Sequence, residues 1–279
     1  MSNFVACYSV LNEGDFLGYS LESVLPWVDK VIIVEGAYKN HVPSNRGKTT
    51  SIDNTVEVIK GFLDNPKVTY VHASMQNQNR QRDQYLKYLE TGDIMLMVDG
   101  DELYCERDLS FIRNKFNNDQ GLTWMKIKHV AFSKDFRHHW AGYPYYKSGR
   151  ISAYRYDADW KYYARKNGYD AIHLWENNGR GNGVTHHKKG YSAKLGECCT
   201  LHAKFLKPND LLAIKDSYYY VNDPHAMKAM NLKRKYTAQE AVRMLAARDQ
   251  RSKPALIYNG RLPKCLIDHP LAPPNGNYE

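Results

Sequence analysis

An α/β fold is predicted for this chain, with a mixed sheet flanked by helices and a helical C-terminal extension. Strand-like and helix-like segments alternate through the first half, which is typical of parallel strands joined by crossover helices. One segment, Ile94–Val98, is apolar throughout, as a strand buried on both faces would be. With 279 residues, the chain is long enough for one large domain and an appendage, but short for two equal domains.

The first half begins with an apolar, β-rich segment, Phe4–Leu11, which the polar residues Asn12–Asp15 end. Apolar residues then recur at helical spacing up to Pro26, so a helix is expected there. Further strands are predicted at Lys30–Val34, Val68–His72 and Ile94–Val98, further helices at Ile52–Leu63 and Gln78–Leu89, and a long loop at Gly36–Thr50.

Beyond residue 103 the pattern changes to β-rich segments separated by loops. Leu122–Phe132 mixes β-branched, aromatic and basic residues as a strand does, and Gly149–Tyr163 indicates a strand pair. The glycine-rich stretch Asn177–Gly190 is a predicted loop. After Leu201–Phe205 the chain is expected to be helical, and the tail from Ser252, rich in Pro, Gly and Asn, is expected to wrap over the domain or to fray.

Composition limits the environment and the partners of the protein. The 39 Lys+Arg against 30 Asp+Glu give a net charge of +9, which favours polyanionic partners such as nucleotides, nucleic acids or anionic surfaces. No run approaches the roughly 18 apolar residues of a membrane helix, and no signal-peptide pattern is visible, so a cytoplasmic location is expected. The five cysteines have no C-x-x-C spacing, which argues against a disulfide framework and a zinc site.

Two carboxylates, Asp99 and Asp101, follow the apolar strand Ile94–Val98 and stand one residue apart. Ligands of open parallel sheets bind at the carboxyl ends of the strands. Hard cations such as Mg²⁺ and Mn²⁺ take carboxylate ligands and keep positions open for phosphate oxygens. The spacing therefore predicts a divalent-cation site that binds a diphosphate, with an ordinary surface turn as the alternative interpretation.

Four short motifs occur in a fixed order along the chain: Val10–Glu13, Val28–Gly36, Gln81–Tyr85 and Val98–Glu102. In this order they resemble the family-2-like glycosyltransferases of the GT-A fold, over about the first 105 residues and in patches beyond them. The resemblance implies a Rossmann-like mixed sheet and transfer of a sugar from a nucleoside-diphosphate sugar, most commonly a UDP-sugar, to an acceptor hydroxyl. It also implies Mn²⁺ or Mg²⁺ as the cofactor.

The resemblance further implies a division of the chain. Residues 1–206 would form the GT-A domain, with the nucleotide-sugar-binding half at 1–105 and the acceptor-side half at 106–206. Residues 207–279 would form a basic, helical C-terminal extension, in which Thr237–Glu240 matches a capping box.

Individual roles also follow from the resemblance. Asp99 and Asp101 would bind the metal, with Asp101 also acting in catalysis, and His202 would complete the metal or diphosphate site. The residues implied to contact the donor are Asn12, Glu13, Glu35, Arg82, Asp99 and Arg150. Alternatives are a helix-capping turn for Asn12 and Glu13, a solvent-facing charge for Arg82, and a buried, hydrogen-bonded histidine for His202.

An inverting transferase needs a carboxylate that accepts the proton of the acceptor hydroxyl. Glu176 is the candidate base, because Ile172–Glu176 resembles a "His-Glu" element of the family. Asp157, Asp159 and Asp170 are rival candidates, and a plain loop charge is the alternative interpretation of Glu176.

Basic residues gather in two segments, 126–137 and 228–253. Because such charge attracts polyanions, one hypothesis is a nucleic-acid acceptor, for instance a hydroxymethylated base in DNA, which would have to be flipped out of a duplex. A saccharide or a lipid-linked sugar is the alternative acceptor. A nucleic-acid-binding module without catalysis is the alternative of another class, although such a module does not require Asp99 and Asp101.

Overall fold

The computed structural model describes residues 2–39, 41–74, 78–140, 142, 144–164, 170–176, 189–208, 210–214, 217, 237–246 and 255–279. The predicted alternation of strands and helices is present in the first half. Its elements are β1 (Phe4–Val10), α1 (Leu17–Val24), β2 (Lys30–Glu35), α2 (Thr55–Lys60), β3 (Val68–His72), α3 (Gln78–Leu86) and β4 (Ile94–Val98).

The second half is richer in strands. Its elements are β5 (Glu102–Leu103), α4 (Glu106–Asn118), β6 (Trp124–Ser133), β7 (Asp135–His139), α5 (Pro144–Ser148), β8 (Arg150–Arg155), β9 (Trp160–Ala164), β10 (Asp170–Glu176), β11 (Gly190–Ser192), β12 (Cys199–Phe205), α8 (Ala238–Ala246), β13 (Leu256–Ile257), β14 (Arg261–Leu262), a 3-10 helix (Lys264–Leu266) and β15 (Asn277–Tyr278). None of the helices in the described ranges has the length and apolar character that crossing a membrane requires.

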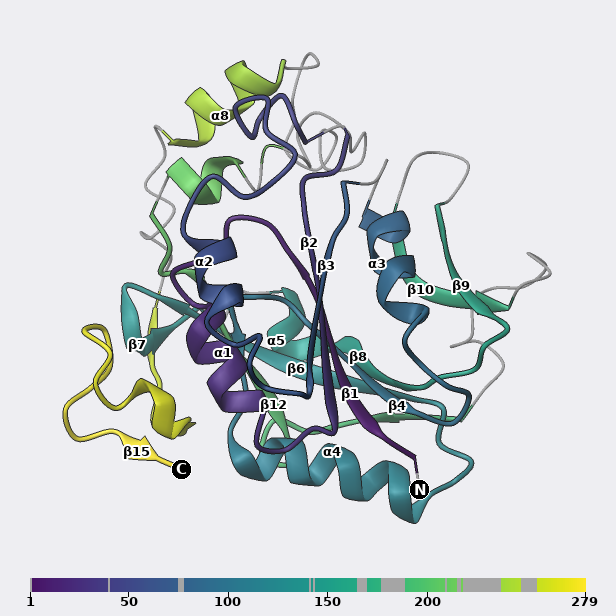
Figure 1. Ribbon diagram of the computed structural model, residues 1–279. Coiled ribbons are helices and arrows are strands. Elements are labelled where there is room, and N and C mark those ends of the chain that lie inside the picture. Colours follow the sequence, from purple (N-terminus) through teal and green to yellow (C-terminus); the bar gives the residue numbers. More distant parts are fainter. Residues whose placement is uncertain are drawn as a thin grey trace.

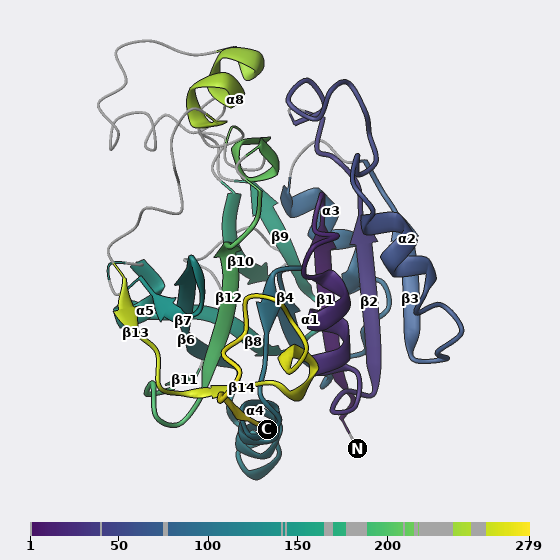
Figure 2. The ribbon, with the colours of Figure 1, turned by 90° about the vertical axis from the view of Figure 1, so that its left-hand side faces the viewer.

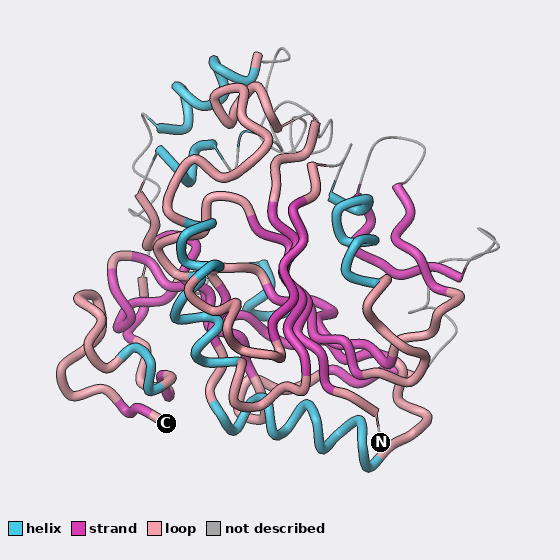
Figure 3. The backbone as a smooth tube through the Cα atoms, viewed as in Figure 1, coloured by secondary structure: helices cyan, strands magenta, loops and turns pink. Residues whose placement is uncertain are grey.

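One large mixed sheet organises these elements, with the strand order β13-β7-β6-β8-β4-β1-β2-β3 (Figures 1 and 3). Strands β4, β1, β2 and β3 are parallel to one another, while β8 is antiparallel to both β4 and β6. The carboxyl end of β4 and the first residue of β8 therefore meet at the same edge. The predicted α/β fold with a mixed sheet flanked by helices is confirmed.

The apolar sequence of β1 suits its central position in the sheet. Phe4, Ala6 and Tyr8 face a core that also contains side chains of α1, α2 and α4, whereas Val5 and Cys7 face a second core that contains side chains of α3. All of these residues are buried, so an apolar run without polar alternation suits a strand covered on both faces. Figure 1 shows α3 on one side of the sheet and α1 and α2 on the other.

The strand pair predicted over Gly149–Tyr163 is wrong in its pairing, although both strands exist. Strand β8 lies between β4 and β6, and β9 pairs with β10 in a separate two-stranded sheet. Both edges of β8 are already hydrogen-bonded in the large sheet, so no edge is left for β9.

The C-terminal residues 255–279 pack against the domain. Leu262 and Leu266 belong to a core that also includes Leu201 and Ala203 of β12 and Phe132 of β6. In Figure 2 this segment, in yellow, runs across the side of the molecule that carries α1 and β12. Of the two outcomes expected for the tail, wrapping over the domain is the one observed in the described residues.

Gly36 follows β2, and its backbone conformation there requires a glycine. Its φ is +146°, and a Cβ placed there would lie 2.6 Å from the carbonyl oxygen of Ala73. Changing Gly36 to alanine should lower the free energy of unfolding by about 1–3 kcal/mol, because the strained backbone and the close contact must both be accommodated. Chemical denaturation measures this loss.

The matched control for that substitution is Gly18→Ala in helix α1. A Cβ at Gly18 would meet only Val58, at 3.7 Å, so this change should be neutral or stabilise by up to about 1 kcal/mol. Equal stability of the Gly36→Ala variant and the wild type would contradict the packing described for the end of β2.

Candidate active site

The candidate site lies at the edge of the sheet where β1 and β4 end. The turn Asp99-Gly100-Asp101 follows β4, Arg150 begins β8, and Arg82 reaches the same place from α3. Strand β12 pairs with β5 in an antiparallel arrangement, which places His202 of β12 opposite Glu102 of β5. The sheet topology thus collects residues that are far apart in sequence.

Two arginines contact Asp99. Arg150 Nη1 donates to Asp99 Oδ2 at 2.8 Å, and Arg82 Nη2 lies 3.8 Å from Asp99 Oδ1. The side chain of Arg82 is 4% exposed, so it is not the solvent-facing helix charge of the alternative interpretation. Asp99 is 25% exposed, compared with 11% for Arg150, so solvent reaches Asp99 more readily than either arginine.

Asp101 is fully buried and contacts two basic side chains. His202 Nε2 lies 3.1 Å from Asp101 Oδ1, and Lys207 Nζ lies 2.7 Å from Asp101 Oδ2. Lys207 also forms an ion pair with Glu13, from the turn after β1. Sequence reasoning did not identify Lys207, because nothing in the sequence distinguishes a lysine that the fold buries from one on the surface.

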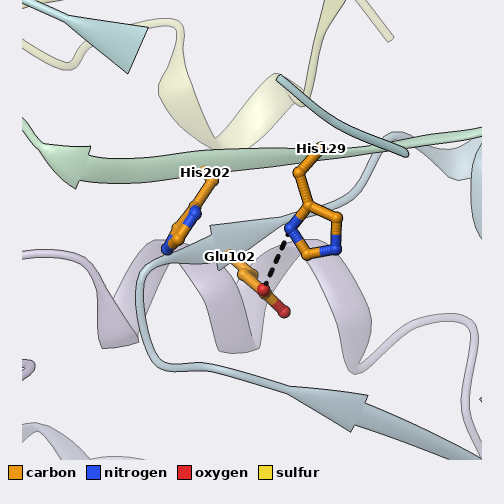
Figure 4. Close-up of side chains that lie close together, drawn as sticks. All are labelled: Glu102, His129 and His202. Carbon is orange, nitrogen blue, oxygen red and sulfur yellow. Dashed lines mark ion pairs between the residues drawn. The ribbon is translucent and has the colours of Figure 1, made fainter. Parts of the chain in front are cut away.

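Glu102 is the third carboxylate of the cluster and was not predicted as a site residue. Arg150 Nη2 donates to both of its carboxylate oxygens, at 2.8 and 3.0 Å, so Arg150 bridges Asp99 and Glu102. His129 Nδ1, from β6, lies 3.4 Å from Glu102 Oε1. Figure 4 shows the carboxylate of Glu102 with the rings of His129 and His202 on either side of it.

The donor atoms of this cluster suit a divalent metal ion. Ligand atoms of Glu102, His129 and His202 all lie within 4.8 Å of one another, and all three residues are buried. His202 also contacts Asp101, so the predicted set of Asp99, Asp101 and His202 adjoins the buried triad. Carboxylate oxygen combined with imidazole nitrogen is a ligand set that Mn²⁺ accepts, whereas Mg²⁺ prefers oxygen alone.

Burial dominates the titration of this cluster. It raises the pKa of Glu102 to about 8, although Arg150 lowers it, and it brings the pKa of His129 well below the usual value, with Arg150 and His202 adding to the shift. His129 is therefore neutral in the folded protein at pH 7, which is the form in which an imidazole binds a metal ion.

These shifts predict how stability depends on pH. Between pH 4.5, the ordinary pKa of a glutamate, and about pH 8, Glu102 keeps its proton in the folded protein but loses it on unfolding, so stability falls as the pH rises through this range. His129 has the opposite effect, but only below pH 6.5, the ordinary pKa of a histidine. From pH 6.5 to 8 the protein should therefore lose up to about 1.4 kcal/mol of stability per pH unit because of Glu102.

Urea denaturation at several pH values in that range tests the prediction. The Glu102→Gln variant lacks the titrating group, so its stability should change less than that of the wild type between pH 6.5 and 8. Parallel curves for the two proteins would assign the pH dependence to another group.

Asn12 and Glu35 contact the loop that follows β2. The backbone of Asn12 is left-handed, with φ 54°, and its side chain accepts from the amide of Ile52 at 2.8 Å and donates to Asn45 at 2.8 Å. Glu35 accepts from the amide and the hydroxyl of Ser51, at 2.6 and 2.8 Å, and from His72. Both side chains are buried, so they fix this loop in place at the carboxyl edge of the sheet.

Several predicted residues lie away from the cluster or outside the described part. Glu176 ends β10 and Asp170 begins it, but only their backbone is described. Asp157 and Asp159 are in the turn between β8 and β9, where Asp159 donates its amide to Asp157 at 3.1 Å. Of the basic segment 228–253, only residues 237–246 are described.

Comparison with known proteins finds similarity among solved structures. The structure of S. aureus TarS 1–349 matches with a TM-score of 0.47 and 11% identity, covering 84% of this chain and 76% of that chain. The mannosyltransferase PcManGT from Pyrobaculum calidifontis, in complex with GDP-Man and Mn²⁺, matches with a TM-score of 0.46 and 14% identity, covering 88% of this chain and 70% of that chain.

A further structure of S. aureus TarS matches with a TM-score of 0.35 and 18% identity over 47% of this chain, which spans only 22% of that chain. No protein-family model and no curated protein matches the sequence. Each of these TM-scores is below 0.5. The function therefore has to follow from the residues of the site.

Proposed function

We propose that this protein is a metal-dependent glycosyltransferase that moves a sugar from a nucleoside-diphosphate sugar to an acceptor hydroxyl. The observation that supports this function best is the arrangement of Asp99 and Asp101. They follow a central parallel strand at its carboxyl end, and the basic side chains Arg82, Arg150 and Lys207 contact them. Carboxylates that hold a cation and basic groups that attract phosphate are the components a diphosphate site needs.

In this proposal Asp99, Asp101 and His202 hold the divalent ion, which when bound supplies positive charge to the departing diphosphate. Arg150 and Arg82 orient Asp99, and Arg150 also donates to both carboxylate oxygens of the buried Glu102. The exposed side of Asp99 is where a donor reaches the cluster. Residues 1–105 form the donor-binding half and residues 106–206 the acceptor-side half.

The loop after β2 forms one wall of the nucleotide pocket in this proposal. Glu35 and Asn12 bind its residues 45–52 through buried hydrogen bonds, so their main contribution to donor binding is to position this loop. Glu13 acts at the same edge through its ion pair with Lys207.

Glu176 is the proposed base that accepts the proton of the acceptor hydroxyl. Changing Glu176 to glutamine should lower kcat about 10²- to 10⁴-fold and leave the affinity for the donor unchanged, because a base acts in the transition state. Steady-state kinetics together with donor titration measure both effects. Unchanged turnover would exclude Glu176, and Asp157→Asn, Asp159→Asn and Asp170→Asn variants would then identify the base.

The direct test of the function is hydrolysis or transfer of the donor. UDP-glucose, UDP-N-acetylglucosamine and GDP-mannose are incubated with the protein and Mn²⁺, Mg²⁺ or EDTA, and release of the nucleoside diphosphate is measured. We expect a UDP-sugar to be turned over with Mn²⁺ and not with EDTA. A thermal shift screen adds an independent readout, because a ligand at 100 times its dissociation constant stabilises a protein by about 2.7 kcal/mol.

A hydroxyl on a base of DNA is the acceptor that the net charge of +9 supports. The protein is incubated with Mn²⁺, a UDP-sugar mixture and DNA that contains or lacks 5-hydroxymethylcytosine, and the nucleosides are analysed by mass spectrometry. A hexose or pentose added to the modified base supports this acceptor. Donor turnover without any change in the DNA points to a saccharide or a lipid-linked sugar, and DNA binding without donor turnover points to a binding module.

A further inference from the structure

Lys207 is a buried cation inside the cluster of acidic residues. It follows β12 directly, and its side chain is 1% exposed. Its ammonium group forms ion pairs with Asp101, at 2.7 Å, and with Glu13. A lysine is buried to this extent only where opposite charges and hydrogen bonds replace its water.

The two carboxylates that hold Lys207 come from the turns after adjacent parallel strands, β1 and β4. Gly100 allows these turns to pack together, because a Cβ at this position would lie 2.7 Å from Cβ of Glu13. Asp101 is held further by its backbone, whose carbonyl accepts from the amide of Ala203 in β12 at 2.8 Å. Lys207, Glu13 and Asp101 are therefore fixed against one another.

The contact between Lys207 and Asp101 affects metal binding. Asp101 Oδ2 contacts the ammonium group of Lys207, while Oδ1 contacts His202. A divalent cation that binds Asp101 must lie close to this ammonium group, and two cations that share one buried carboxylate repel each other. Lys207 keeps its ion pair with Glu13, but its ammonium group still weakens metal binding by Asp101, and further negative charge close to Lys207 offsets this effect.

We propose that Lys207 competes with the divalent ion for Asp101 and contacts the donor diphosphate once the ion is bound. This inference rests on the proposed function and assigns a role to a residue that the sequence did not single out. Its consequence is cooperative binding: the diphosphate brings the negative charge that compensates Lys207, so the donor strengthens metal binding and the metal strengthens donor binding by the same factor.

The test measures Mn²⁺ affinity directly, by electron paramagnetic resonance of free Mn²⁺, with and without saturating UDP. Without UDP, the Lys207→Met variant should bind Mn²⁺ at least tenfold more tightly than the wild type. The factor by which UDP improves Mn²⁺ binding should be at least tenfold smaller in the variant. Lys207→Arg, which keeps the charge, should resemble the wild type.

Lys67→Met is the matched control for loss of a partly buried lysine. Lys67 donates to the carbonyl oxygens of Leu25 and Val28, away from the cluster, so this variant should leave Mn²⁺ binding unchanged. The Lys207→Met change leaves two buried carboxylates without their cation. If the variant does not fold, Glu13→Gln with Lys207→Met is compared with Glu13→Gln alone, and again at least tenfold tighter Mn²⁺ binding is expected.

The outcomes separate the two proposals. Wild-type protein that binds Mn²⁺ while Lys207→Met, or the Glu13→Gln variant with Lys207→Met relative to Glu13→Gln alone, binds it no more tightly overturns the role of Lys207 and leaves the proposed function intact. Wild-type protein that binds no Mn²⁺, with or without UDP, overturns the metal-dependent function and the role of Lys207 together.

Discussion

Changing Asp101 to asparagine is expected to lower kcat/KM for metal-dependent sugar transfer by about 10³-fold or more. The expected size follows from the several kcal/mol that a metal ion contributes to stabilising charge in a transition state, since each 1.4 kcal/mol changes the rate tenfold. Asp101 is fully buried between His202 and Lys207, so its carboxylate is held in place at the proposed metal site. Initial rates over a range of Mn²⁺ concentrations measure the loss.

Asparagine keeps the shape of the side chain, and circular dichroism would verify that the variant is folded. Asp119→Asn is the matched control, because Asp119 forms a surface ion pair with Lys189 and should not affect turnover. Near wild-type transfer by the Asp101→Asn variant would remove Asp101 from the metal site, and the buried triad of Glu102, His129 and His202 would become the better candidate.

Above pH 8, where Glu102 is ionised in the folded protein, the Arg150→Met variant is expected to lose about 3–5 kcal/mol of stability, because it leaves two paired carboxylates without their common cation. Arg150 Nη1 contacts Asp99 and Nη2 contacts Glu102, and the arginine side chain is only 11% exposed. Arg150 thereby neutralises the negative charge that this turn places at the end of β4. Urea denaturation compares the free energies of unfolding.

Arg137→Met is the matched control, because Arg137 is 58% exposed and its ion pair with Asp135 lies on the surface. Such pairs contribute about 0–1 kcal/mol. At the same pH, adding Glu102→Gln to Arg150→Met should restore part of the loss, since one of the two carboxylates that Arg150 contacts is then removed. A loss for Arg150→Met as small as that of the control would contradict the bridging role of Arg150.

The sequence predicted the first half of the fold well because its signals are local. Strands such as Phe4–Val10 and Ile94–Val98 are apolar throughout, and the breaks between elements carry Gly, Pro or polar residues. Helix α4 was not predicted, although Leu109, Ile112 and Phe116 have helical spacing and are buried. Most of the other residues of this helix are charged or polar, so the segment as a whole is not recognisably apolar.

The candidate site was predictable where a strand end identified it. Asp99 and Asp101 follow an apolar strand, and this position alone indicates a ligand site in a parallel sheet. The residues that contact these aspartates were harder to predict from the sequence, because the pairing between Lys207 and Asp101 depends on how β12 is placed in the sheet. Local patterns carry no information about such placement, so Glu102, His129 and Lys207 emerged only from the structure.

The bridge that Arg150 makes between Asp99 and Glu102 has a consequence for the modularity of the protein. The first 105 residues contain the acidic turn, but the side chains that neutralise most of its charge, Arg150 and Lys207, come from later in the chain. Expressed alone, this half would have to bury Asp101 and Glu102 without their cations. Residues 1–105 are therefore not expected to fold when they are fused to a different acceptor domain. A chimaeric protein should keep β8 and β12 together with residues 1–105.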